Sequence, residues 1–304
     1  MKDLCELKEL LMYRRLNSRM DLNAIETSHY LNLEKGFEGE KQFETWLKQN
    51  RGNGIILSDL LLQTNLTTYQ IDSLYLTPQK LYLFEVKNFE GDYHLDQEKW
   101  LTSVKKEVKN PLLQLKRNDT LFRILLQEHL FQFPVEAILV FINPGFHLYQ
   151  ASSSHPIIFH SQLNRFAKTL KKNNEGTMKG IHSKLAEKLL ALHLEKSPFE
   201  RLPEYEYDLV GKGVVYRSCH SRYSSLKRSY FTCDKCQLRE AYLPAVLRNI
   251  EEFRLLFPDR KMTTDQIHDW CEIIQSKKTI RKILNEHYDR VGYGKFSHYV
   301  SKQV

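Results

Sequence analysis

The segment that most limits how this chain can fold is residues 81–87, because it is apolar on both faces and yet carries two charges at its end. Side chains alternate across a strand, so two leucines lie on one face, and a tyrosine, a phenylalanine and a valine lie on the other. A strand with two apolar faces is expected to be buried. The leucine face nevertheless ends in Glu85 and Lys87. Such local breaks in a pattern concentrate at functional sites, so both residues are candidates.

A second predicted strand, residues 71–76, is separated from the first by the four-residue loop 77–80. Symmetric pairing across this loop places Asp72 opposite Glu85, with Cβ atoms about 4.5–5.5 Å apart. Two ionised carboxylates at that distance repel each other unless a cation or a proton lies between them. Carboxylate oxygens suit Mg²⁺ or Mn²⁺, so the hairpin predicts a metal site, provided that no bulge shifts the register.

Three other residues are expected to reach the same place. Lys87 follows Glu85 by two residues on one face, where it could orient or help deprotonate a metal-bound water. Glu40 shares a face with apolar residues of a predicted helix over 36–48, so it points inward. Gln114 lies on the apolar side of a helix that begins at an Asn-Pro pair.

Two glycines precede Glu40 in the predicted helix. Each of Gly36 and Gly39 weakens a helix by about 1 kcal/mol relative to alanine. Their presence therefore indicates that the backbone approaches a neighbouring element closely at both positions.

Four short motifs follow one another along the chain on suitable predicted elements. They are Gly36-x-x-Gly39-Glu40, Gln70-Ile71-Asp72, Glu85-Val86-Lys87-Asn88 and Asn110-Pro111-x-x-Gln114. Over residues 35–155 this series resembles the nuclease-related (NERD) domain, a branch of the PD-(D/E)XK restriction-endonuclease-like superfamily. The resemblance implies an α/β fold with a mixed central sheet flanked by helices, and Mg²⁺-dependent cleavage of phosphodiester bonds. It also implies that Glu40, Asp72 and Glu85 bind the metal, that Lys87 acts on the water, and that Gln114 supports them.

The cysteines predict a second kind of site. Cys233 and Cys236 have the C-x-x-C spacing of a zinc knuckle, with Cys219 as a third ligand and His220 as the nearest candidate for the fourth. Zinc here would be structural, since a catalytic zinc keeps one position open to water. The alternative is a set of free thiols in a basic loop.

The charge of the chain is concentrated beside these cysteines. The net charge is +8, and residues 212–239 contain seven basic residues against one acidic residue. Such a patch suits phosphate groups, although a solvated basic loop is the simpler interpretation. The bases proposed to contact nucleic acid here are Arg222, Lys227 and Arg228.

The last part of the chain predicts helices over 240–257, 264–272 and 276–287. The spacing of the last two fits a helix-turn-helix, although the turn lacks the usual glycine. A plain helical bundle with a solvated basic face is the alternative. The side chains expected to face DNA are Lys277, Lys278, Thr279, Arg281 and Lys282.

These patterns predict an α/β protein with appended smaller parts. The expected order is a helical extension (1–34), the nuclease-related domain (35–196), a linker (197–211), a basic zinc-knuckle segment (212–239) and a helical, helix-turn-helix-like domain (240–304). No apolar run has the length of about 20 residues that a membrane helix needs, and no secretory signal is evident, so a cytoplasmic location is expected.

The sequence therefore predicts a Mg²⁺-dependent nuclease whose basic C-terminal region delivers it to nucleic acid, with DNA as the expected substrate. One alternative is a non-catalytic nucleic-acid-binding protein that acts as a sensor or regulator. Another is an interaction module whose helical tail contacts a protein. A homodimer also stays open, because cutting both strands of a duplex could require two subunits.

Overall fold

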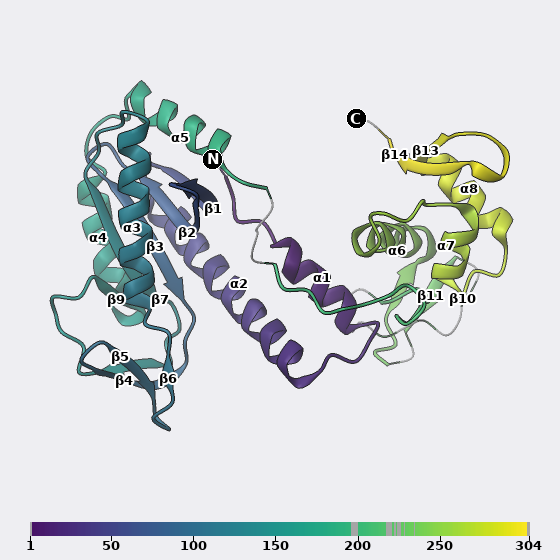
Figure 1. Cartoon of the computed structure of the whole chain (residues 1–304), viewed down its shortest axis with the longest axis horizontal. Helices are drawn as coiled ribbons and strands as arrows, with labels where there is room; N and C mark the ends of the chain where they lie inside the picture. Colours follow the sequence, from purple (N-terminus) through teal and green to yellow (C-terminus); the bar gives the residue numbers. More distant parts are fainter. Residues whose placement is uncertain are drawn as a thin grey trace. The chain divides into compact units, whose positions relative to one another are not determined.

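The computed structural model describes residues 2–195, 200–216, 221, 223, 226–227, 229–233 and 235–302 (Figure 1). The chain divides into two compact units, one made of residues 1–6 and 31–200 and the other of 7–30 and 201–304. The division falls inside helix α2 (Ala24–Asn50). This helix is continuous because no proline interrupts it. The boundary expected at residue 35 therefore lies within a helix, and α2 begins well before the predicted start at residue 36.

The first unit is built on a mixed five-stranded sheet with the strand order β1-β2-β3-β7-β9. Strands β1 to β3 are antiparallel, whereas β3, β7 and β9 run parallel, so the predicted mixed α/β architecture is confirmed. The strands are β1 (Ile55–Thr64), β2 (Thr67–Leu76), β3 (Leu81–Lys87), β7 (Val135–Phe141) and β9 (Ile157–Phe159). The predicted register is confirmed from the pair Leu76–Leu81 to the pair Ser73–Phe84, but the ladder ends there and does not include the predicted pair of Asp72 with Glu85.

Helices cover both faces of this sheet. Side chains of α2 and of α4 (Leu163–Asn173) pack in the core on one face. Side chains of α3 (Pro111–Glu128) and of α5 (Gly180–Leu192) pack on the other face. As predicted, Asn110 caps α3, and its side-chain oxygen accepts a hydrogen bond of 2.9 Å from the Leu112 amide. Strand β3 is thus buried on both faces, as its composition requires.

A second, four-stranded sheet that the sequence did not predict adjoins the first one (Figure 1). Its strand order is β6-β5-β4-β8, from β6 (Glu107–Val108), β5 (Lys99–Thr102), β4 (Gly91–Asp96) and β8 (Phe146–Tyr149). Strand β4 follows β3, and β8 follows β7, so this sheet grows from the carboxyl ends of the two central strands. Its strands are short and mostly exposed, but Trp100 on β5 is fully buried and packs in the core of the first unit.

The second unit is mainly helical. It contains α1 (Lys8–Asn17), α6 (Tyr242–Leu256), α7 (Thr264–Cys271) and α8 (Lys277–His287), followed by a hairpin of β13 (Tyr288–Val291) and β14 (His298–Ser301). A small sheet of β10 (Leu226–Lys227), β11 (Tyr230–Thr232) and β12 (Arg239–Ala241) completes the unit. The three C-terminal helices confirm the sequence expectation, whereas the last hairpin was not predicted.

A buried arginine organises the core of the second unit. The Arg19 guanidinium donates a hydrogen bond of 2.6 Å to Glu252 and one of 2.9 Å to Asn249. It also lies 3.9 Å from the centre of the Trp270 ring. Arg19 and Glu252 are both only 3% exposed, so one buried cation is matched by one buried anion.

Of the helices that the structure describes, none combines the length and the apolar character needed to cross a membrane.

Candidate active site

The candidate site lies where the β2–β3 ladder opens. The last paired residues are Ser73 and Phe84, and Asp72 and Glu85 come next along the two strands. The Val86 amide donates a hydrogen bond of 2.7 Å to the Asp72 carboxylate, which therefore continues the hairpin beyond its last backbone pair. Asp72 is 8% exposed and Glu85 is 1% exposed. The structure thus buries two acids at neighbouring positions.

Both oxygens of Glu85 have partners. The Lys87 ammonium lies 2.6 Å from Oε1, and the Asn118 side-chain amide donates a hydrogen bond of 3.2 Å to Oε2. The same Asn118 amide group donates to the Gln70 carbonyl at 2.9 Å. Asn118 therefore ties helix α3 both to β2 and to the acid on β3. The sequence analysis missed this residue, although a polar side chain on the apolar side of α3 was a usable signal.

Gln114, the residue predicted to reach the site from α3, lies one turn before Asn118 on the same side of the helix. It is half-buried, and it makes no hydrogen bond to an acid that the structure describes. The direct contact from α3 comes from Asn118 instead, because that residue lies one turn closer to Gln70 and Glu85.

Gly39 explains how α2 brings Glu40 to the end of the sheet. A Cβ atom at Gly39 would lie 2.6 Å from the Asn88 Cβ and 3.3 Å from a methyl carbon of Ile142. The helix therefore packs directly against the ends of β3 and β7, as the glycine predicted. The same expectation is wrong for Gly36, where an added Cβ would meet no atom within 4 Å.

A fourth acid, Asp59, borders the site and was not predicted. Its φ of 52° is unusual for a residue other than glycine, and the β1–β2 ladder omits it between Ser58 and Leu60. The Asp59 carboxylate accepts a hydrogen bond of 2.8 Å from the Gln70 side chain. Strained backbone of this kind clusters at functional sites, but a backbone angle leaves no mark in the sequence.

The side chains of the sheet change their alternation at this same place. On β2, Leu74 and Leu76 pack in the core that α3 covers, and so do Tyr69 and Ile71, which precede Asp72. In a regular strand, Ile71 and Leu74 would point to opposite faces, because they are an odd number of residues apart. The alternation of side chains is therefore interrupted between Ile71 and Leu74, where Asp72 lies.

The site holds more negative than positive charge. Burial raises the pKa of Asp72 well above its usual range, and Glu85 and Glu40 add to the rise. Burial also raises the pKa of Glu40 to about 8, with a further contribution from Asp59. For Lys87, burial lowers the pKa, but the carboxylates of Glu85 and Asp72 more than offset this effect and hold the ammonium protonated.

This charge imbalance fits a divalent cation, and the oxygen donors are of the kind that Mg²⁺ prefers. Among the described residues, however, no three His, Cys, Asp or Glu side chains are placed to hold a metal ion. Mg²⁺ commonly takes only one or two carboxylates and completes its shell with water and phosphate oxygens. The pair Asp72 and Glu85 meets that smaller requirement, with Glu40 nearby.

A comparison with known protein families bears on this site. Residues 35–142 match the model of the nuclease-related domain (NERD) family. The match confirms the resemblance for this segment, which contains all five predicted site residues, Glu40, Asp72, Glu85, Lys87 and Gln114. No curated protein and no solved structure matches the chain.

The predicted zinc site lies outside the NERD-matched segment. Cys233 and Cys236 lie at the turn between β11 and β12, where the Cys233 amide donates to the Leu238 carbonyl at 3.0 Å. Cys233 is fully buried, and Cys236 is half-buried. The other predicted ligands, Cys219 and His220, lie outside the described residues, as do Arg222 and Arg228. Lys227 belongs to β10.

Helix α8 also lies outside the NERD-matched segment. Ile280, Ile283 and Leu284 are buried, as its pattern predicted. Lys277 pairs with Asp265 at 2.7 Å, and Thr279 is half-buried near the helix start. The bases expected to face DNA are all exposed, namely Lys277, Lys278, Arg281 and Lys282. Nearer the end of the helix Glu286 is also exposed, and it lies 3.8 Å from the Lys282 ammonium. The helix thus presents a basic face to solvent.

Proposed function

We propose that this chain is a metal-dependent nuclease of the PD-(D/E)XK type that hydrolyses phosphodiester bonds, with DNA as the expected substrate. One observation carries the proposal. The NERD-matched segment buries Asp72 and Glu85 side by side where β2 and β3 separate, with the Lys87 ammonium beside them. A purely structural core gains nothing from like charges in this arrangement, because burying a carboxylate is costly unless a cation compensates it.

Each residue has a role that follows from its contacts. Asp72 and Glu85 would hold Mg²⁺ or Mn²⁺, which would supply polarisation of the phosphate and activation of a water. Lys87 would stabilise negative charge that develops on the phosphate oxygens, since its neighbours hold it protonated. Asn118 would orient Glu85 through the bond to Oε2, and Glu40 would add charge from α2.

The second unit would supply affinity for nucleic acid. The basic face of α8 and the basic segment 212–239 are suited to phosphate contacts, which carry most of the sequence-independent binding. Structural zinc on the Cys233 and Cys236 turn would hold that basic segment in place. This role predicts binding that weakens steeply as salt concentration rises.

Cleavage of labelled single-stranded and double-stranded DNA and RNA, with Mg²⁺, Mn²⁺ or EDTA, tests the proposal. Glu85→Gln and Lys87→Ala are expected to lower the rate at least about 100-fold, because the first removes a charged metal ligand and the second removes the cation proposed to act on the phosphate. An exposed ion pair away from the site, between Lys80 in the β2–β3 loop and Glu136 on β7 at 2.9 Å, provides matched controls, Lys80→Ala and Glu136→Gln. Equal cleavage by site and control variants would exclude this site.

A non-catalytic nucleic-acid-binding protein is the second candidate function. The observation that favours it is that no three potential metal ligands converge among the described residues. Under this alternative, the folded parent protein cuts none of the substrates with any metal, but still binds them in a salt-sensitive manner. The cleavage experiment therefore separates the two functions.

A further inference from the structure

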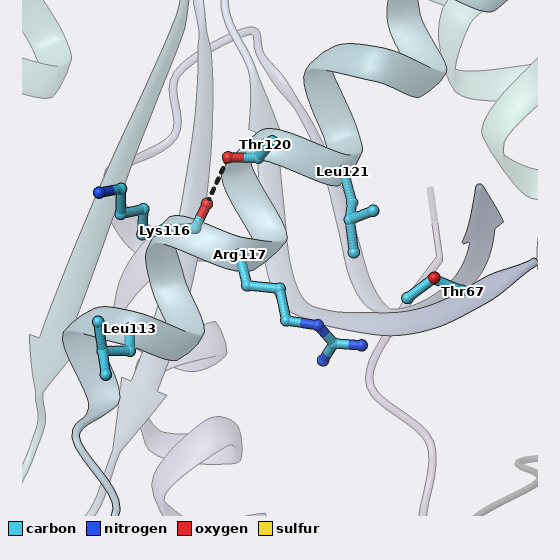
Figure 2. Close-up of a pocket in the computed structure, with 6 residues that line it drawn as sticks. All are labelled: Thr67, Leu113, Lys116, Arg117, Thr120 and Leu121. Carbon is cyan, nitrogen blue, oxygen red and sulfur yellow. Dashed lines mark hydrogen bonds between the residues drawn. The ribbon is translucent and has the colours of Figure 1, made fainter. Parts of the chain in front are cut away.

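A shallow groove lies between helix α3 and the start of β2, the two elements that also carry Asn118 and Asp72. It has a volume of about 430 Å³ and is lined by Thr67, Leu113, Lys116, Arg117, Thr120 and Leu121. Figure 2 shows the Arg117 guanidinium reaching toward Thr67, whereas the Lys116 side chain points away from Thr67. Leu113, which is 54% exposed, and the half-buried Leu121 form its apolar parts.

No acid that the structure describes neutralises the charge of the groove. Arg117 and Lys116 are exposed, and neither forms an ion pair with a residue that the structure describes. The acid nearest to them in α3, Asp119, pairs instead with Arg123 at 2.9 Å. The lining contains no carboxylate. Two unpaired cations between leucines and hydroxyl groups suit a ligand that combines an anion with an apolar surface, as a nucleotide does.

The groove is connected to the candidate active site by consecutive residues of α3. Arg117 donates to the Thr68 carbonyl at 3.3 Å, and the next residue, Asn118, donates to the Gln70 carbonyl and to Glu85. Thr68 precedes Asp72 by four residues, which is about 13 Å along a strand. That distance equals the rise of about four nucleotides in one strand of B-form DNA. A nucleic acid held at the acids can therefore extend to the groove.

We infer that this groove binds the backbone of the substrate strand a few nucleotides away from the bond that is cut, with Arg117 and Lys116 on phosphate oxygens. The inference rests on the proposed nuclease function for its substrate class. The leucines would contact sugar or base surface without reading the sequence. The ligand is a nucleic-acid strand rather than a free phosphate, because a single phosphate would leave the apolar walls of the groove empty.

Binding of a fluorescent oligonucleotide, measured by anisotropy in EDTA at several salt concentrations, tests this inference without cleavage. Lys116→Gln and Arg117→Gln are expected to weaken binding several-fold each, and each is expected to reduce the salt slope by about 0.7 for a single strand. The matched control is Lys168→Gln, which removes an exposed charge from α4 on the other face of the sheet. Inorganic phosphate should compete only weakly.

The outcomes separate this inference from the proposed function. Unchanged affinity and salt slope in both variants would overturn the proposal that the groove binds nucleic acid, whether or not the protein is a nuclease. If Arg117→Gln fails to fold, Lys116→Gln still decides, since the Lys116 side chain makes no hydrogen bond to a described residue. If the parent cuts no substrate but the variants lose binding relative to Lys168→Gln, the groove stands and the nuclease function fails. Strong competition by phosphate alone would overturn the assignment to a strand.

Discussion

The two units bury charge in opposite ways. In the second unit, Arg19 and Glu252 form a matched pair at 2.6 Å, and the other guanidinium nitrogens donate to neutral oxygens. In the first unit, Asp72, Glu85 and Glu40 lie near one ammonium, that of Lys87; burial raises the pKa values of Asp72 and Glu40, and the neighbouring carboxylates add to the rise. A matched pair supports a fold by itself, whereas buried carboxylates that outnumber the cations beside them need a proton or a cation from outside the chain.

The largest expected effect concerns the matched pair. Arg19→Met leaves Glu252 buried without a cation, so the free energy of unfolding of the second unit should fall by about 3–5 kcal/mol. The double variant Arg19→Met, Glu252→Met should recover most of this loss, because it removes both charges. Urea denaturation of parent, single and double variants measures the effect. A double variant as unstable as Arg19→Met would show that the loss does not come from leaving the Glu252 charge without its cation.

The unmatched site should respond in the opposite direction. In EDTA, Asp72→Asn should raise the free energy of unfolding by about 1 kcal/mol, since it removes a repelling charge while its amide oxygen can still accept from Val86. Saturating Mg²⁺ should stabilise the parent by about 2–3 kcal/mol at 100 times its Kd, and the variant by less. Thermal unfolding with Glu136→Gln as control measures both changes. A parent that Mg²⁺ does not stabilise would contradict the metal site.

The pH dependence of stability should differ for the same reason. Because the pKa of Glu40 rises from 4.5 to about 8 on folding, the folded chain holds this proton more tightly than the unfolded chain does. Stability in EDTA should therefore fall, on the order of 2 kcal/mol, as the pH rises through this range. Glu40→Gln should flatten the profile, and the exposed neighbour Glu38→Gln should not. Identical slopes in parent and Glu40→Gln would refute the burial of this charge.

Two glycine substitutions test how closely α2 approaches the site. Gly39→Ala should cost about 1–3 kcal/mol, because its Cβ would overlap the side chain of Asn88. Gly36→Ala has open space in the same helix and should stabilise the protein by up to about 1 kcal/mol. Differential scanning calorimetry of the two variants provides the comparison. Two stabilised variants would mean that α2 lies farther from the sheet.

The sequence predicted those parts of the site that follow from local rules. A four-residue loop with symmetric pairing was enough to predict the β2–β3 register as far as Ser73 and Phe84, one residue before Asp72 and Glu85, and Asn110 with its proline marked the start of α3. Asp59 could not be predicted, since its position depends on a backbone angle in β1. Asn118 in place of Gln114 depends on where α3 packs along the sheet, and that is decided by tertiary contacts.

The hydrogen bond from Val86 to Asp72 has a consequence for reading related sequences. One oxygen of this aspartate extends the β2–β3 hairpin by a hydrogen bond, so a relative without the proposed nuclease activity would still be under pressure to keep Asp or Asn at this position. Glu40 makes no hydrogen bond to a described residue, so no such contact would preserve it. Among relatives of this chain, the residue at the position of Glu40 should therefore distinguish active from inactive nucleases better than the residue at the position of Asp72 does.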